Sequence, residues 1–584
     1  MKDNKKTSPN LNFFFGKLDS KSIYPYPKLN DEQKDFGKAL IDAVSKYFES
    51  VDSEHLDKES LIPDEIYNDL KELGLYGLGV SEDLGGLNLD YSLYARVFSE
   101  VCGNDAAIAT MLGAHQSIGY RPLIIAGSDE QKNKWLPQLA SGDKIASFCL
   151  TEPGSGSDAY SIKTKAVKDK NGNYILNGQK LWITNGGKAD FYSVFAKTSH
   201  IINGKEVEKI SCFIVEKEMD GVTFGSKEDK MGIRASETRA VFFENVKIPK
   251  ENLIGEEGKG FKLAMMVLNS GRLSLGSGCV GGMKQLLKLA TEHANSRHQF
   301  GKPIKDFGLI QEKLAYMAAR CYATESIVYL STSLIDQGLH DYQLESAICK
   351  VYGSESLWKV VDQAMQVAAG NGYMKEYPYE RIMRDSRINL IFEGTNEILR
   401  VFIALSGLNE LGKEYKSLSK LKDFNSFLKD PIKSVGVLSD FASNRLNKNF
   451  IKSFENINEK LSEENDKLAK MISKFSLKSE DILLKHGKKI IGNEFLQGRI
   501  SNMCINLYVY LATLSRTASI LDDETINEED KDYCFNLCKI ILKESRGEFM
   551  RNLKQLDTNL DKLIINTSES VSKRNGYGLD IINF

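Results

Sequence analysis

The sequence has few of the features that mark a membrane, metal-binding or disulfide-linked protein. No stretch approaches the roughly 18 uninterrupted apolar residues that a membrane-spanning helix needs. The 9 cysteines form no C-x-x-C pair and the 7 histidines show no metal-ligand spacing, so we expect reduced thiols and no catalytic metal. Proline is scarce, at 11 residues, and no long low-complexity linker is apparent.

An excess of charge of one sign is also absent. Lys and Arg number 77 against 79 Asp and Glu, which gives a formal net charge of −2. Such a chain has no global basic field, so we expect no nucleic-acid partner. The first residues, MKDNKKTSPNLNFFFGK, lack both a signal-peptide core and the Arg-rich pattern of a mitochondrial presequence. We therefore expect a bacterial-type cytoplasmic location, or a mitochondrial one if the chain is eukaryotic.

The composition that is present is that of a globular protein, with 42% hydrophobic and 27% charged residues over 584 positions. Apolar positions at helical spacing in 31–51 and again from about 260 to 410 predict helices. Between them, short Val-, Ile- and Phe-rich runs separated by turns such as Asn171-Gly172 predict an antiparallel β domain of sandwich or barrel type.

The predicted fold class is therefore a mostly α, multidomain α+β protein. The expected segments are an N-terminal extension (1–29), an N-terminal helical domain (30–145), a β domain (146–254), a helical bundle domain (255–410), a linker (411–435) and an extra C-terminal helical domain (436–584).

Three segments carry residues suited to chemistry. In FCLTEPGSGSDA (148–159), small residues leave backbone N–H groups free to converge on an anion. In KLWITNGGKAD (180–190), alternation would put Trp182 and Thr184 on one face of a strand. In RINLIFEGTNEILR (387–400), Glu393 follows an apolar run and Thr395 is a suitable N-cap for a helix over 396–406. Each segment alone also fits an ordinary turn, a core Trp or an exposed loop Glu.

Taken together, the ordered motifs are far more specific. The three segments occur with KMGIRASET (230–238), RHQFGKPI (297–304) and QVAAGNGYMKE (366–376). This set resembles the acyl-CoA dehydrogenase family. The very-long-chain branch is the most similar, through AHQSIGY (114–120), DFGLIQEKLA (306–315) and a C-terminal extension containing KHGKKIIGNEFLQGRI (485–500). The resemblance covers essentially the whole chain.

The resemblance implies FAD as the cofactor. Arg297 and Phe300 match family residues that reach the FAD of a neighbouring subunit. The chain departs from the family at Ala369-Gly370, where a Gly-Gly pair is common. The implied FAD contacts are Phe148, Leu150, Thr151, Gly156, Ser157, Trp182, Thr184, Arg297, Phe300, Gln366, Gly370, Thr395 and Glu397.

The resemblance also implies the reaction. The Glu393 carboxylate would remove the α-proton of an acyl-CoA while its backbone N–H binds the thioester carbonyl, and the β-hydrogen would leave as hydride to the flavin. Some relatives carry the base at the position of Gly271, which cannot act as one, and this supports Glu393. The implied substrate contacts are Ser157, Asn269, Arg272, Glu393 and Gly394, although Arg272 also fits a structural ion-paired role.

Long-chain substrates are favoured by the branch-level resemblance. Gly113, Ala114, Ser117 and Gly119 would leave depth for a long tail on a pocket helix, but small residues also allow close helix packing. The implied partners are an electron-transfer flavoprotein and a second copy in a homodimer. An acyl-CoA oxidase and a scaffold or assembly protein that keeps the fold are the alternatives.

A membrane contact is considered for one C-terminal stretch. Within 440–475, Phe450, Ile451, Phe454 and Ile457 would form an apolar helical stripe. The polar face carries acids as well as lysines, so core packing is favoured over peripheral membrane contact.

Overall fold

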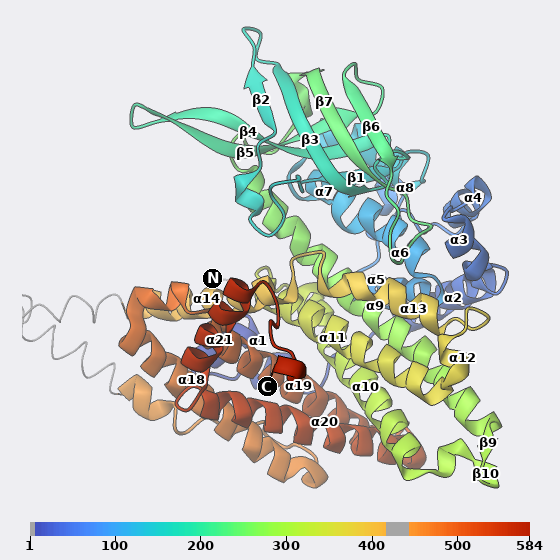
Figure 1. The fold of residues 1–584 in the computed structure, drawn as a ribbon, viewed down its shortest axis with the longest axis vertical. Helices are drawn as coiled ribbons and strands as arrows, with labels where there is room; N and C mark the ends of the chain where they lie inside the picture. Colours follow the sequence, from blue (N-terminus) through green and yellow to red (C-terminus); the bar gives the residue numbers. More distant parts are fainter. Residues whose placement is uncertain (1–5, 416–442, 584) are drawn as a thin grey trace, which may run out of the picture. The chain divides into compact units, whose positions relative to one another are not determined.

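The computed structural model describes residues 6–415 and 443–583 (Figure 1). These residues form two compact units. The first contains the described residues of Met1–Ser8, Lys21–Leu399 and Ala512–Ile541, and the second those of Pro9–Ser20, Arg400–Leu511 and Leu542–Phe584. The fold is mostly helical with one large sheet, which confirms the predicted fold class. None of the helices in the described ranges is long and apolar enough to cross a membrane.

The first unit opens with helices whose starts are set by capping residues. Asn30 and Gln33 form a capping box at α2, Asp90 caps α5, and Ser128 with Gln131 forms a second capping box at α8. The helices are α2 (Asp31–Phe48), α3 (Ser53–Glu59), α4 (Asp64–Glu72), α5 (Tyr91–Asn104), α6 (Ala106–Gly113), the π-helix η3 (Ala114–Gly119), α7 (Arg121–Ala126) and α8 (Asp129–Ala140).

A sheet of eight strands follows, in the order β6-β7-β3-β2-β4-β5-β8, with β1 added to β4 (Figure 1). The Asn203-Gly204 turn, in which both residues have positive φ, closes the β4–β5 hairpin. The sheet is antiparallel as predicted except that β1 and β2 each run parallel to β4. The strands are β1 (Ala146–Cys149), β2 (Lys165–Lys168), β3 (Tyr174–Thr184), β4 (Phe191–Ile202), β5 (Lys205–Glu216), β6 (Val222–Lys227), β7 (Thr238–Ile248) and β8 (Leu253–Ile254).

The helical bundle of the first unit is centred on the long helix α9, which packs closely because it is rich in glycine. A Cβ at Gly281 would lie 1.8 Å from the carbonyl oxygen of Ser99 in α5, and one at Gly276 would lie 3.2 Å from Cys349 in α11. The helices are α9 (Gly260–Ser296), α10 (Gly308–Asp336), α11 (Gln343–Ala368), α12 (Gly370–Tyr373), α13 (Tyr379–Arg387), the short turn η7 (Ile388–Leu390) and the start of α14 (Asn396–Glu414), with a small hairpin of β9 (His298–Gln299) and β10 (Lys302–Pro303).

In the second unit, an N-terminal segment packs into a helical core. The helix α1 (Pro9–Phe14) buries Phe14 completely, and its ring lies 4.8 Å from that of Phe475 in α18. A Cβ at Gly407 would lie 2.1 Å from the Phe14 ring, so only glycine allows this approach. The other α-helices with described residues in this unit are α14 from Arg400 onward, α18 (Ser462–His486), α19 (Glu494–Leu521), α20 (Glu528–Gln555) and α21 (Asp561–Arg574).

The predicted linker and the predicted apolar stripe lie near the start of the C-terminal part. Of the predicted linker, 411–414 belongs to α14, whereas 416–435 lies outside the described residues, as does 436–442 of the predicted C-terminal domain. The predicted apolar helical stripe is wrong, because 451–458 forms no helix. Instead, the Asn465 side chain bonds both the N–H and the carbonyl of Phe454, at 3.1 and 2.9 Å, and holds it buried in a loop.

Candidate active site

Glu393 lies in a strained turn between η7 and α14. Its φ is 59° and that of Gly394 is 91°, so both residues occupy the left-handed region, which is costly for Glu. The Thr395 hydroxyl accepts a hydrogen bond from the N–H of Ile398 at 3.3 Å, as predicted for an N-cap of the following helix. The chain therefore maintains an unfavourable backbone conformation at the residue that we expect to be the base.

Two buried cations hold this turn through its backbone. The Nε of Arg272 donates to the carbonyl of Glu393 at 3.1 Å, and its Nη1 donates to Asn269 Oδ1 at 3.1 Å. The Nζ of Lys350, which is fully buried, donates to the carbonyl of Gly394 at 2.8 Å and to Asn396 Oδ1 at 2.7 Å. Arg272 and Asn269, predicted as substrate contacts, thus lie directly beside the turn. Lys350 was not identified from the sequence, since nothing in its local pattern distinguishes it from a surface lysine.

The environment of Glu393 suits a proton acceptor. Burial raises the pKa of its carboxyl from 4.5 to about 7, while the positive charges of Arg272 and Lys350 oppose the rise. Its Oε2 is buried and has no hydrogen-bond partner within the described part of the chain. Its backbone N–H likewise donates to no acceptor among these residues. The side chain and the N–H are both free to meet a ligand.

Gly271 in α9 makes room for this carboxylate. A Cβ at Gly271 would lie 2.9 Å from Glu393 Oε2 and 2.9 Å from Ile118 Cγ2. A longer side chain at position 271 would therefore occupy the space that the Glu393 carboxylate fills.

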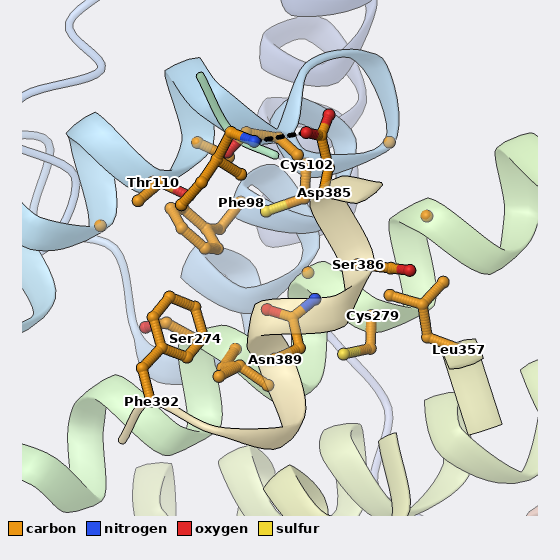
Figure 2. Close-up of a pocket in the computed structure, with 18 of the residues that line it drawn as sticks. Phe98, Cys102, Thr110, Ser274, Cys279, Leu357, Asp385, Ser386, Asn389 and Phe392 are labelled. Atoms are coloured by element: carbon orange, nitrogen blue, oxygen red, sulfur yellow. Dashed lines mark hydrogen bonds between the residues drawn. The ribbon is translucent and has the colours of Figure 1, made fainter. Parts of the chain in front are cut away.

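Glu393 opens onto an elongated cavity of about 160 Å³, part of which is shown in Figure 2. The α9 residues along its wall run from Gly271 to Gln285, which corresponds to roughly 21 Å of helix at 1.5 Å per residue. The side walls are mainly apolar or small, and include Phe98, Cys102, Ala109, Leu275, Cys279, Leu357 and Phe392.

Three of the four small residues predicted to give depth do line this cavity: Gly113, Ala114 and Ser117. Gly119 is not among the lining residues. A Cβ there would lie 2.5 Å from the carbonyl of Ala114, so its role is close packing.

One part of the cavity wall is polar and was not expected from the sequence. Asp385 in α13 accepts a hydrogen bond from the backbone N–H of Ile233, marked by the dashed line in Figure 2. Asp385 also pairs with Arg381 at 3.5 Å, and Arg381 reaches Glu54 at 2.8 Å. Asp385 thus ties α13 to the loop before β7, and Arg381 ties it to α3.

The predicted flavin residues of the β domain lie along β1, the following loop and the end of β3. Gly156 and Ser157 are exposed, and a Cβ at Gly156 would meet nothing within 4 Å. The loop is anchored by a buried ion pair at 2.8 Å between Lys180 and Glu152, neither of which was predicted. The other predicted residues here are Phe148 and Thr151, both partly exposed, and Leu150, which is buried.

The predicted pair of Trp182 and Thr184 lies at a bulge at the end of β3, on either side of the buried Ile183. Trp182 has a φ of 55° and lies where the β3–β7 register shifts, so strict alternation is broken. Its side chain is 63% exposed instead of joining the core. Thr184 lines the same cavity as Glu393.

The remaining predicted flavin residues are not brought into the Glu393 cavity. Phe300 is 93% exposed in the β9–β10 hairpin, next to the exposed Arg297. Gln366, Gly370 and Glu397 are exposed at the ends of α11, α12 and α14, and Thr395 is partly exposed. Ala369, where the family often has glycine, has a φ of 52°, a conformation that favours glycine.

Family models match nearly the whole chain. The N-terminal, middle and C-terminal domains of acyl-CoA dehydrogenase match residues 30–143, 147–246 and 258–408, and the ACAD9/ACADV C-terminal domain matches 459–577.

Individual relatives of known sequence or structure indicate the same family. The chain is 42% identical to the very long-chain specific acyl-CoA dehydrogenase, mitochondrial, of Homo sapiens, over 90% of this chain and 81% of that protein. It is similar to the structure of an acyl-CoA dehydrogenase complexed with FAD from Bacillus anthracis, with a TM-score of 0.77, 33% identity, and 93% and 91% of the two chains covered. Butyryl-CoA dehydrogenase from Megasphaera elsdenii has a TM-score of 0.60 and 39% identity, covering 64% of this chain and 97% of that one. The chain belongs to the acyl-CoA dehydrogenase family.

Proposed function

We propose that this protein is an FAD-dependent acyl-CoA dehydrogenase that converts long-chain fatty acyl-CoA to trans-2-enoyl-CoA in fatty acid β-oxidation. The observation that carries the proposal is Glu393, a carboxylate with an unpartnered buried oxygen at an elongated, mainly apolar cavity. Thr184, from the predicted flavin strand, lines the same cavity.

The residues present fit FAD. A large indole that is 63% exposed at Trp182 suits coverage by a planar ring, and the open space around Gly156 suits a backbone approach to phosphate. We assign Phe148, Leu150, Thr151, Gly156, Ser157, Trp182 and Thr184 to one subunit's flavin, together with Gln366, Gly370, Thr395 and Glu397, and Arg297 and Phe300 to that of a neighbour. When bound, FAD supplies the hydride acceptor.

The chain's own residues then account for proton removal. Deprotonation next to a thioester requires stabilisation of the developing enolate oxygen as well as a base. The free N–H of Glu393 is suited to bind that oxygen while the Glu393 carboxylate takes the α-proton. A pKa near 7 lets the carboxylate be ionised in half the molecules at neutral pH and still be basic enough for the transfer.

The other substrate residues follow from the same turn. Arg272, which is itself bonded to Asn269, holds the turn through the carbonyl of Glu393, and Gly394 gives the turn its geometry. Ser157 contacts the CoA end of the substrate. The length of the cavity along α9 and the small residues Gly113, Ala114 and Ser117 support a long acyl chain.

The partners and organisation are part of the proposal. An electron-transfer flavoprotein would take up the electrons, and a second copy would cover the exposed Phe300 in a homodimer. We also propose the domain boundaries 30–145, 146–254, 255–410 and 436–584, and a cytoplasmic or, in a eukaryote, mitochondrial location.

The test is an anaerobic titration of the purified protein with palmitoyl-CoA and, separately, butyryl-CoA. A yellow protein whose flavin band bleaches with palmitoyl-CoA and much less with butyryl-CoA is expected. A protein that cannot be loaded with FAD would overturn the proposal. Rapid oxygen consumption by the reduced protein in an oxygen electrode would assign it to the oxidases instead.

A further inference from the structure

A second cavity, of about 250 Å³, lies beside the cavity that Glu393 lines, here called the acyl cavity, in the first unit. It is formed by α5, η3, α7, α9 and α10, and it shares Ser117 and Ser274 with the acyl cavity. The proposed reaction assigns no role to the rest of its lining.

This second cavity contains a cation without a counter-anion. The Nη2 of Arg121 donates a hydrogen bond to the hydroxyl of Tyr91, and the guanidinium lies 5.3 Å from the centre of the Tyr91 ring. The Nε of Arg121 is buried and has no acceptor in the described ranges. The groups that raise the pKa of Arg121 most are tyrosines, with no carboxylate among them. A buried charge is ordinarily paired, because its desolvation is costly otherwise.

A second polar group of the cavity is also unsatisfied. Gln116 is only 3% exposed, and its amide nitrogen donates to the carbonyl of Leu75 at 3.2 Å. Its Oε1 has no hydrogen-bond partner within the described residues. An ordered water that accompanies a ligand would satisfy this acceptor.

The remaining wall defines the chemistry of the occupant. Leu89, Ile124 and Leu273 are apolar, while Tyr91 and Thr332 supply hydroxyls. One guanidinium and one neighbouring hydroxyl match the two oxygens of a carboxylate. A phosphate, which is larger, more strongly hydrated and usually doubly charged, would leave oxygens facing the apolar side.

We propose that this cavity binds a short apolar monocarboxylate, with its carboxylate on Arg121 and Tyr91 and its hydrocarbon body against Leu89, Ile124 and Leu273. The occupant contacts Ser117 and Ser274 from the side opposite the acyl chain. Binding at this cavity does not depend on the dehydrogenase reaction.

The test is isothermal titration calorimetry of the FAD-loaded protein with hexanoate. Saturable binding is expected, and Arg121→Gln should weaken it by at least about tenfold, as loss of a charge-assisted hydrogen bond does. The matched control, Arg551→Gln, changes an exposed arginine paired with Glu548 and should leave the affinity unchanged. Uncharged hexanol and inorganic phosphate should each bind much more weakly than hexanoate.

A cavity-filling variant keeps the proposal testable if Arg121→Gln does not fold. Ala95 is buried in α5 and lines the cavity, so Ala95→Leu should abolish hexanoate binding without altering any charge. The proposal is overturned if hexanoate does not bind the native protein at millimolar concentration. It is also overturned if Arg121→Gln or Ala95→Leu binds as well as the native protein, or if hexanol or phosphate binds as tightly.

Discussion

Replacing Lys350 by Met should change the pH dependence of the reaction by raising the pKa of Glu393. Burial lowers the pKa of Lys350 itself to about 8, so it is mostly charged at pH 7 and favours the ionised form of Glu393. A nearby opposite charge typically lowers the pKa of a carboxylate by about 1 unit or more. Lys350 acts on Glu393 through space, because its hydrogen bonds go to Gly394 and Asn396. Its loss should therefore move the Glu393 pKa from about 7 to about 8, and the ionised fraction at pH 7 from about one half to about one tenth.

The assay is anaerobic stopped-flow reduction of the flavin by palmitoyl-CoA between pH 6 and pH 10. At pH 7 the rate for Lys350→Met should be roughly fivefold lower, and the gap should close above pH 9, where Lys350 is neutral in the native protein. The matched variant Lys350→Gln keeps an N–H donor for the Gly394 carbonyl and should show the same pH shift with a smaller loss of stability. An unchanged pH midpoint in both variants would refute the electrostatic role of Lys350.

Three further predictions test other contacts. Gly271→Ala should slow flavin reduction by about a hundredfold, because the new methyl group displaces the Glu393 carboxylate. A native rate of reduction in the same stopped-flow assay would contradict this. Glu393→Gln should raise the melting temperature clearly at pH 8 and much less at pH 5. A carboxyl whose pKa is raised on folding makes the protein less stable as the pH rises from about 4.5 to about 7, so an equal change at both pH values in scanning fluorimetry would contradict it. Phe14→Ala should destabilise the protein by about 3–5 kcal/mol in urea unfolding, whereas Phe450→Ala, at a side chain that is 79% exposed, should have little effect.

The features predicted from the sequence are those set by local patterns. The N-cap at Thr395 and the alternation of helical and β segments depend on residues that are near neighbours in the chain. The choice of Glu393, which lines the cavity, as the base came from the family resemblance of an ordered set of motifs and not from the residue itself.

The features that were missed depend on contacts between distant residues. Lys350 reaches Gly394 across 44 positions, and Glu152 reaches Lys180 across 28. The packing of Phe14 against Phe475 likewise cannot be predicted from the periodicity of hydrophobic residues. The bulge that ends β3 at Trp182 was also missed, because a register shift and a positive φ leave no mark on the period of two.

The central claim, that Glu393 is the base, is tested most directly by anaerobic titration of Glu393→Gln with palmitoyl-CoA. The substitution removes the carboxylate and keeps the shape of the side chain. A protein that retains bound FAD and its yellow colour is predicted, with bleaching at least about a hundredfold slower than in the native enzyme. Bleaching at the native rate would contradict the account and show that another residue removes the α-proton.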